Sequence, residues 1–134
     1  MDTKFSKCGI REFGGSIHSI FAATHPEMLK RFNFSTENAK KNTMNAATLL
    51  VATRKAAKII EKWKECAIEK DCMAPEGSHR ECDIPKLYKN EYANCHRYDQ
   101  SVLAILLYNC SQNSSDYLES TPLINIERLG SPPP

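Results

Sequence analysis

The chain has 134 residues, of which 41% are hydrophobic and 25% are charged, proportions typical of one globular domain rather than a disordered or fibrous chain. Its 18 Lys and Arg residues nearly balance its 16 Asp and Glu residues, and the formal net charge of +2 comes without a strong basic block. We therefore expect no nucleic-acid partner. The longest apolar run, "SVLAILLY", is far shorter than the roughly 20 residues that span a bilayer, so we also expect no transmembrane segment in this chain.

The first half of the chain predicts two strands and a short helix. "SIHSIFAA", residues 16–23, is rich in β-branched and aromatic residues and follows two glycines, which predicts a strand. In "THPEMLKRF", Thr24 and Glu27 fit a T-x-x-E capping box with a proline in the first turn, which predicts a short helix. The polar residues 32–43 are expected to form a loop, and "AATLLVAT", residues 46–53, a second and more buried strand.

The second half predicts two helices separated by an irregular segment. From residue 53 to 67, apolar residues recur at three- and four-residue spacing with charged residues between them, the pattern of an amphipathic helix. Residues 68–95 contain prolines and cysteines and are expected to form a long irregular connection with covalent links. Residues 99–109 predict a second helix that is apolar on most faces and therefore buried. The tail predicts a last strand at 121–128, ahead of a disordered Pro-rich end at 129–134.

Cysteines and glycosylation sequons both indicate an oxidising compartment. An even number of cysteines is typical of a disulfide framework, and N-x-S sequons are glycosylation acceptors in secreted proteins. The start "MDTKFSKCGIREF" nevertheless lacks the apolar centre of a signal peptide. We therefore expect a piece of a longer lumenal or secreted protein whose signal or anchor lies upstream of Met1; the alternative is a complete cytoplasmic protein with reduced cysteines. The six cysteines are Cys8, Cys66, Cys72, Cys82, Cys95 and Cys110, and the sequons begin at Asn33, Asn109 and Asn113.

Disulfides are the expected state of the cysteines in an oxidising lumen, mainly within residues 66–110, where five of the six lie. The sequence leaves their connectivity open among about fifteen possibilities. A zinc site that uses these cysteines and His96 is the alternative. It is disfavoured because structural zinc ligands usually come in pairs about two to four residues apart, whereas the gaps here are longer and irregular.

The common catalytic motifs are absent from the sequence. It contains no G-x-S-x-G, no phosphate loop and no dinucleotide fingerprint. It also contains no D-x-D, the motif with which metal-dependent transferases hold a divalent cation against a diphosphate. Asp99 stands just before "QSVLAILL", where it suits the N-cap of a helix, and Asn45 is placed to close the loop ahead of "AATLLV". For both residues a purely structural interpretation stays open.

Two segments taken together resemble a known enzyme class. "TMNAATLLVATRKAAKIIEKW" followed by "YDQSVLAILL" resembles the acceptor-side, C-terminal half of glycosyltransferases with the type A nucleotide-sugar fold. The stretches "EFGGSIHSIFAATHPEM", "CAIEKDCMAPEGS" and "CHRYDQSVLAILLYN" are similar to a nematode family of uncharacterised, glycosyltransferase-like proteins. The resemblance implies an α/β fold, a partial nucleotide-diphospho-sugar transferase domain over residues 1–128 with a disulfide-stapled loop region.

The resemblance also implies roles for particular residues. Asp99 would be a catalytic residue facing the transferred sugar or the acceptor, with Gln100 as a substrate-binding neighbour. Asn45 would lie at a strand edge near the donor sugar, although Ala47 stands where the wider family more often has Gly. The implied partners are a nucleotide sugar and a glycan acceptor. A divalent metal such as manganese is expected only in a full-length relative, so no cofactor is expected in this chain.

Two functions from different classes follow. The first is a fragment or truncated relative of a lumenal glycosyltransferase, resident in the Golgi lumen or secreted, and inactive by itself because the D-x-D half is missing. The second is a small disulfide-stapled extracellular binding module without catalysis.

Overall fold

The protein is a mixed α/β domain built around a small sheet. A computed structural model describes residues 7–119, apart from the side chains of residues 45–48. Strands β1 (Ile10–Ser19), β2 (Thr43–Ala52) and β3 (Leu118–Glu119) form a sheet in the order β2-β1-β3. β1 pairs with β2 in antiparallel fashion and with β3 in parallel fashion, so β1 is the central strand.

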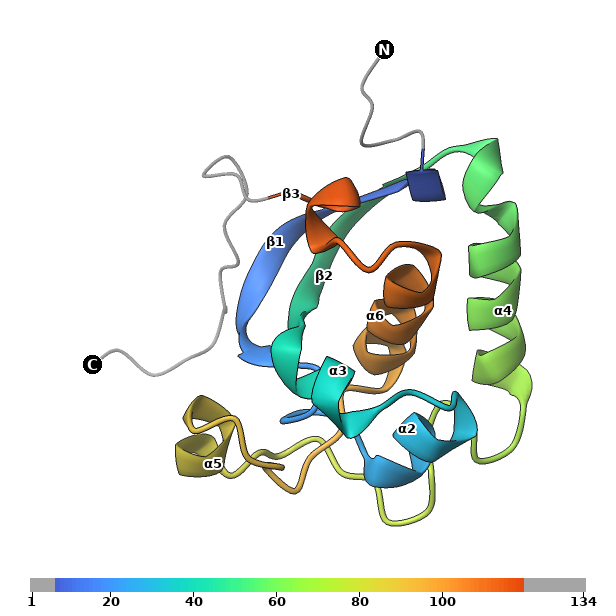
Figure 1. Cartoon of the computed structure of the whole chain (residues 1–134). Helices are drawn as coiled ribbons and strands as arrows, with labels where there is room; N and C mark the ends of the chain where they lie inside the picture. The colour runs from blue at the N-terminus through green and yellow to red at the C-terminus, as the bar shows by residue number, and fades with distance from the viewer. Residues whose placement is uncertain (1–6, 120–134) are drawn as a thin grey trace, which may run out of the picture.

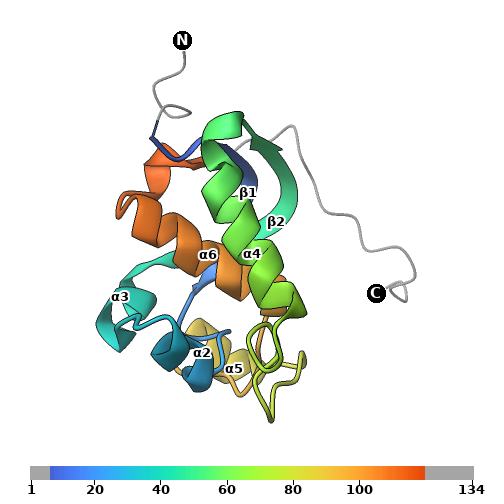
Figure 2. The same ribbon diagram turned by 90° about the vertical axis from the view of Figure 1, so that its right-hand side faces the viewer.

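Helix α6 forms the centre of the domain. α6 (Tyr98–Cys110) lies between the sheet and α4 (Ala57–Ile68), which follows the short 3₁₀ helix η1 (Arg54–Ala56) (Figures 1 and 2). Every residue of α6 from position 101 to 108 is buried, as expected for a helix that is apolar on all sides. α4 is instead amphipathic, with Cys66 buried and Trp63 half-buried against the core.

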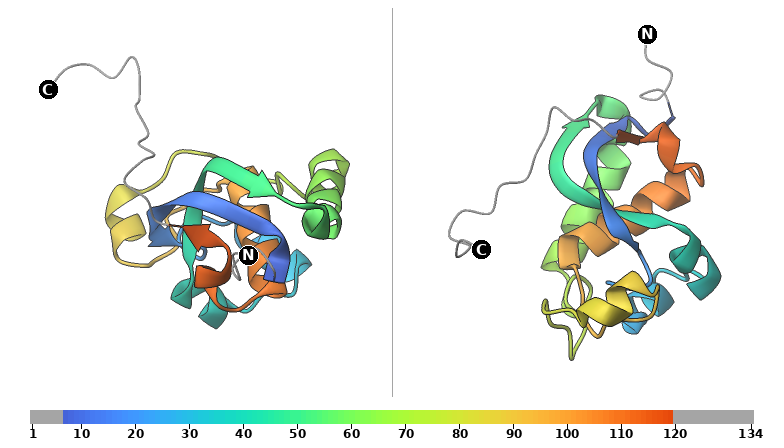
Figure 3. Two further views of the ribbon diagram at one scale, coloured as in Figure 1. Left: turned by 90° about the horizontal axis from the view of Figure 1, so that it is seen from above. Right: turned by 90° about the vertical axis from the view of Figure 1, so that its left-hand side faces the viewer.

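Three short helices gather at the end of the sheet where α6 begins. They are α2 (Pro26–Arg31), α3 (Thr36–Lys41) and α5 (Ile84–Tyr88), and they lie toward the lower end of the long strands in Figure 1 and in the side view of Figure 3. A second 3₁₀ helix, η2 (Ser114–Asp116), leads into β3. This end of the domain therefore consists mainly of short elements and turns.

The two long helices are confirmed close to their predicted limits, and the second strand begins three residues earlier than predicted. The first strand was predicted too late in the chain, because Gly14 and Gly15 were treated as its boundary. They lie inside β1, at a point where the register with β2 shifts on both sides of Gly15. Glycine within a strand commonly marks such a bulge. Residues 20–23, predicted as strand, form a turn instead.

Several local predictions between the long elements are wrong. Thr24 does not cap α2; the side chain of His25 accepts the hydrogen bond from Glu27 N–H instead. Residues 32–43 are not only loop, since Ser35 caps α3 within them. The irregular connection 68–95 likewise contains α5, which Asp83 caps. Both short helices were missed because two turns carry too little hydrophobic periodicity to be recognised.

Three disulfides link the cysteines, as predicted. Cys66–Cys72 and Cys82–Cys95 close loops of sequence separation 6 and 13 within the predicted region. Cys8–Cys110 joins the start of β1 to the end of α6 across a sequence separation of 102. No free cysteine remains among the described residues. The structure thus shows a disulfide framework, with a long-range link that the cysteine spacing did not specify.

Gly9, next to the long-range disulfide, is required by a close approach. Its φ is +72°, and an added Cβ would lie 2.7 Å from the backbone nitrogen of Ala56 and 2.7 Å from Oγ1 of Thr53. Other residues rarely adopt this backbone conformation, and here they would also clash.

Two of the predicted features lie outside the described residues, namely the strand at 121–128 and the Pro-rich end at 129–134. Within residues 7–119, no helix is both long and apolar enough to cross a membrane.

An unpaired carboxyl group lies in the core beside the sheet. Glu12 is fully buried, and neither of its carboxylate oxygens has a hydrogen-bond partner. Its backbone N–H donates to the carbonyl of Tyr117, which fixes the backbone of β1 at this position. Burial raises the pKa of Glu12 from 4.5 to about 8. The group is therefore protonated in the folded protein at neutral pH.

This carboxyl group predicts an inverted pH dependence of stability. The folded protein keeps the Glu12 proton up to about pH 8, whereas the unfolded chain releases it near pH 4.5. The free energy of unfolding should therefore fall by roughly 4 kcal/mol as pH rises through this window. In Glu12→Gln that loss should disappear, so urea unfolding should show the variant to be more stable than the parent at pH 8. Glu61→Gln, on the exposed side of α4, is the control, and parallel pH profiles for Glu12→Gln and the parent would contradict the assignment.

Candidate functional site

The start of α6 has an unusual backbone. Asp99 was predicted to be the N-cap, but the helix begins one residue earlier, and Arg97 occupies the cap position without a side-chain cap hydrogen bond. The carbonyl of Arg97 accepts from the N–H groups of Gln100 and Ser101. Tyr98 has φ +38°, in the left-handed region that costs a bulky residue about 1–2 kcal/mol. Tertiary contacts, rather than local preference, therefore fix where α6 starts.

The buried imidazole of His96 supplies two of these contacts. Its Nδ1 accepts a hydrogen bond from the backbone N–H of His25 at 3.0 Å, and its Nε2 lies 3.0 Å from the carbonyl oxygen of Met73. A backbone N–H can only donate and a carbonyl can only accept. His96 is therefore neutral, with its proton on Nε2, and it joins the residue 25 turn, the residue 73 loop and the start of α6.

Burial reinforces the neutral state of His96. It lowers the pKa of the imidazole from 6.5 to about 4, and the nearby charge of His25 acts in the same direction. A proton on Nδ1 would also remove the acceptor of the His25 N–H. The imidazole is thus a structural group at neutral pH rather than a general base.

Further hydrogen bonds hold the first turn of α6 against the segment after β1. The backbone N–H of Arg97 donates to the carbonyl of Ala23 at 3.0 Å. The hydroxyl of Ser101 also donates to Ala23 O, and the hydroxyl of Thr24 donates to Ser101 Oγ at 2.9 Å. Thr24 and Ser101 are fully buried. Thr24 was predicted to cap α2, but its hydroxyl instead helps to position the start of α6.

A groove of about 270 Å³ opens between α4 and the start of α6. Trp63 lines this groove, and its indole Nε1–H donates a hydrogen bond to the backbone carbonyl of Asp99 at 3.1 Å. The carboxylate side chain of Asp99 is exposed. The groove is lined by Ile60, Trp63, Lys64, Ala67, Met73 and Asp99.

The composition of this groove, called here the Trp63 groove, defines what it can bind. Its surface is apolar, and Asp99 and Lys64 line it without presenting their charged groups to it. An apolar groove of this kind favours a ligand with an apolar face. An aromatic side chain that is fixed by its own hydrogen bond provides a rigid contact surface.

The other residues predicted for substrate binding do not share the Trp63 groove. Gln100 follows Asp99 in the first turn of α6 and is half-buried. Asn45 lies in β2, opposite Gly15 of β1. Since α6 lies between the sheet and α4 (Figure 1), Asn45 belongs to the sheet side of α6 and the groove to its α4 side. Asn45 was also expected to close a loop, and it is inside the strand instead.

A larger cavity near α2 is a weaker candidate. It has a volume of about 710 Å³ and is lined mostly by charged residues, including Glu27, Lys30 and Arg31. Its cations are already paired, Lys30 with Glu27 at 2.8 Å and Arg31 with Glu69. Exposed pairs of this type contribute little binding or stability, so the cavity resembles an ordinary solvated surface.

The structure also shows where the possible metal ligands and the glycosylation sequons lie. Within residues 7–119, no cluster of three or more His, Cys, Asp or Glu side chains could hold a metal ion. Asn33, Asn109 and Asn113 are all exposed. The side chain of Asn113 caps η2 by accepting from Ser115 N–H. Glycosylation at the three asparagines stays a prediction.

Comparison with known proteins found no relative. No family model matches the chain, and searches of curated proteins and of solved structures returned no significantly similar chain.

Trp63 and Met73 were not among the residues that the sequence singled out for a site. Trp63 belongs to the apolar stripe of α4, where an aromatic residue is usually core, and Met73 lies in an irregular segment. Only their position in the same groove as Asp99 distinguishes Trp63 and Met73 from ordinary core and loop residues. The useful signal would have been a single large aromatic residue near the end of an otherwise highly charged helix.

The corrected helix start predicts opposite effects of Ala at two aspartates. At Asp83, which caps α5, Asn should be nearly neutral and Ala should lower the free energy of unfolding by about 1 kcal/mol. At Asp99, inside the first turn, the Ala variant should be at least as stable as the Asn variant, because alanine is the better helix former. Thermal and urea unfolding of the four single variants measure this order. A destabilised Asp99→Ala beside a neutral Asp99→Asn would restore Asp99 as the cap.

Proposed function

We propose that the chain is the acceptor-side part of a lumenal glycosyltransferase and that it holds a saccharide in the Trp63 groove. The observation that carries this proposal is the apolar groove beside the hydrogen-bonded indole of Trp63, with the exposed residue Asp99 among its lining residues. A sugar ring has an apolar face of C–H groups and a rim of hydroxyls. The first matches the aromatic and apolar lining, and in this proposal the hydroxyls reach out of that lining to the Asp99 carboxylate and the Lys64 ammonium.

The first turn of α6 suits this task. The N–H groups of the first helical turn and the helix dipole favour a carboxylate there, so Asp99 is well placed to accept hydrogen bonds from a ligand. The indole hydrogen bond uses the backbone oxygen of Asp99 and leaves its side chain available. In a complete enzyme this carboxylate would act on the transferred sugar or on the acceptor hydroxyl.

Two further observations support a part of a larger enzyme. The outer face of the β1–β2 pair exposes Ile17, Leu49 and Val51, at 74%, 47% and 42% of their full accessibility. Exposed apolar side chains on a strand pair are consistent with cover by another domain or partner. The sequence also lacks the D-x-D that would hold a metal and a diphosphate. We therefore expect the chain to bind a saccharide without transferring it.

The disulfides support the proposed location. Such bonds persist in the secretory pathway and outside the cell, and they are rare in the cytosol. The Golgi lumen or secretion is consistent with both the disulfides and the exposed sequons.

The second candidate is a disulfide-stapled extracellular binding module without any link to catalysis. The Cys8–Cys110 disulfide favours it, because that bond closes nearly the whole described domain on itself. Both candidates bind through the same groove. They differ in whether a longer protein that contains this domain transfers sugar, and in whether that transfer needs the Asp99 carboxylate.

Tryptophan fluorescence tests the proposal directly, because Trp63 is the single tryptophan of the chain. A panel of neutral and acidic oligosaccharides should contain at least one that changes the Trp63 emission in a saturable way. Asp99→Ala should weaken that binding about tenfold or more, since truncating a charged hydrogen-bond partner typically costs about 1.5–3 kcal/mol. Glu61→Ala removes the same charge from the exposed side of α4 and should leave the affinity unchanged.

Other outcomes would overturn the proposal. Absence of a saturable change with every saccharide, or binding that Asp99→Ala does not weaken, would exclude the Trp63 groove as a sugar site. Turnover of a nucleotide sugar by the chain alone with manganese would show that the missing half is unnecessary. In a longer active protein, unchanged sugar transfer by Asp99→Asn would favour the non-catalytic module.

A further inference from the structure

The Cys82–Cys95 disulfide differs from the other two in its surroundings. Cys95 is fully buried, whereas Cys82 is only partly buried and lines a cavity of about 500 Å³. Both residues of the Cys66–Cys72 bond are 3% exposed, whereas Cys8–Cys110 also joins a buried to a partly buried cysteine. Cys82 is set apart by its contact with the Arg97 guanidinium. One sulfur of the Cys82–Cys95 bond is therefore open to a reagent while the other is protected. The cavity is lined by Arg80, Glu81, Cys82, Ile84 and Arg97.

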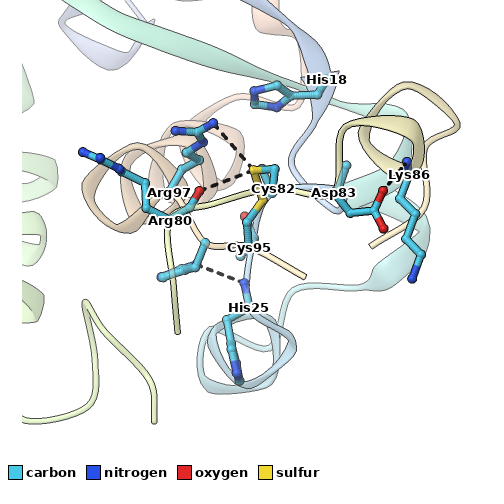
Figure 4. Close-up of a disulfide and its surroundings, with 12 residues drawn as sticks. His18, His25, Arg80, Cys82, Asp83, Lys86, Cys95 and Arg97 are labelled. Carbon is cyan, nitrogen blue, oxygen red and sulfur yellow. Dashed lines mark hydrogen bonds between the residues drawn. A yellow bond between two sulfur atoms is a disulfide. The ribbon is translucent and has the colours of Figure 1, made fainter. Parts of the chain in front are cut away.

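One cationic group contacts the accessible sulfur. A guanidinium nitrogen of Arg97 lies 3.6 Å from Sγ of Cys82, whereas the Arg80 side chain points away from the sulfur and is 75% exposed (Figure 4). Within the described residues, no carboxylate lies at ion-pair distance from Arg97. Glu81 is 3.7 Å from Arg80, but its side chain is 88% exposed. The guanidinium of Arg97 therefore favours the approach of a negatively charged reagent to Sγ of Cys82.

Arg97 is also an unfavourable residue type for the N-terminal position that it occupies in the helix. It occupies the N-cap of α6, where a cation opposes the helix dipole and no side-chain oxygen is supplied to the first N–H groups. The adjacent Tyr98 adopts a left-handed conformation. Violations of local preference that a fold sustains commonly mark functional positions. Here they hold a guanidinium against a disulfide.

We propose that the Cys82–Cys95 disulfide is a thiol-exchange site that reacts with small anionic thiols, and that Arg97 draws the anion to Cys82. This site is separate from the Trp63 groove and does not depend on the saccharide proposal. The reactive atom is Sγ of Cys82, and the buried Sγ of Cys95 is the leaving group.

The exchange proceeds in two balanced steps. A thiolate attacks Sγ of Cys82 and forms a mixed disulfide, while the electron pair of the broken S–S bond goes to Cys95, which leaves as a thiolate and takes a proton from water. A second thiolate then attacks the thiol's own sulfur in the mixed disulfide and releases Cys82 as a thiolate beside Arg97. Two thiols are oxidised to one small disulfide, and the protein disulfide is reduced.

The reaction would release the loop that carries α5. Residues 83–94 lie between the two cysteines, and this loop includes α5 and its cap, Asp83. Cys95 also directly precedes His96, the residue that anchors the start of α6. Opening the bond frees the loop from one of its ends without touching the Cys8–Cys110 link.

Three thiols of different charge test the proposal on the folded, full chain. Mercaptoethanesulfonate is anionic, mercaptoethanol is neutral and cysteamine is cationic. Each is added at equal thiolate concentration, the reaction is quenched with acid and an alkylating reagent, and peptide mass spectrometry assigns the opened cysteines. We expect Cys82–Cys95 to open first, and about three- to tenfold faster with the anionic thiol than with the cationic one. High salt should reduce this ratio.

Variants assign the charge effect to Arg97. Arg97→Gln should bring the anionic-to-cationic rate ratio close to one, and Arg97→Lys should restore most of it. Lys62→Gln, a charge change on the exposed side of α4, should leave the ratio as in the parent. If Arg97→Gln does not fold, the proposal is tested by the salt dependence of the anionic-to-cationic rate ratio in the parent. Earlier opening of either other disulfide, or equal rates for the three thiols in the parent, would overturn the proposal.

Discussion

The neutral imidazole of His96 is the contact on which the arrangement around α6 depends. It joins three segments that are far apart in sequence, through the N–H of His25 and the carbonyl of Met73. Buried polar groups with both sites satisfied restrict geometry strongly, because each lost partner leaves an uncompensated polar atom in the core. This contact holds α6 where Tyr98 must take an unfavourable backbone conformation. Asp99 of this turn lines the Trp63 groove, and Arg97 lines the cavity at Cys82.

The cost of this arrangement is offset elsewhere in the domain. α6 supplies an unbroken buried segment from position 101 to 108, and burial of its apolar side chains is the main stabilising contribution. The Cys8–Cys110 disulfide restrains the unfolded chain over a sequence separation of 102. Small domains with a limited core are commonly stabilised by such covalent links. The stabilising features lie away from the strained turn, which leaves that turn free to carry charged and exposed side chains.

The sequence predicts the elements whose signal is long and periodic, and it fails where a single tertiary contact decides. α4 and α6 were predicted because apolar spacing over three or more turns is unambiguous. Asp99 as a cap was wrong, because the helix start is set by His96 and Ala23 rather than by the best local capping residue. Thr24 failed for the same reason, since its hydroxyl bonds to Ser101. Predicting the Trp63 groove would have required knowing which side of α4 packs against α6. Hydrophobic periodicity shows which side of α4 is apolar but does not show which helix covers it.

The most direct test of this account is the protonation state of His96. Long-range proton–nitrogen correlation spectra of uniformly ¹⁵N-labelled protein distinguish a protonated from an unprotonated ring nitrogen. The account predicts a proton on Nε2 and none on Nδ1, with both signals unchanged as pH falls from 7 to 5, because the pKa of His96 lies at about 4. A proton on Nδ1 at neutral pH, or titration of His96 near 6.5, would contradict the claim that its neutral ring holds the start of α6.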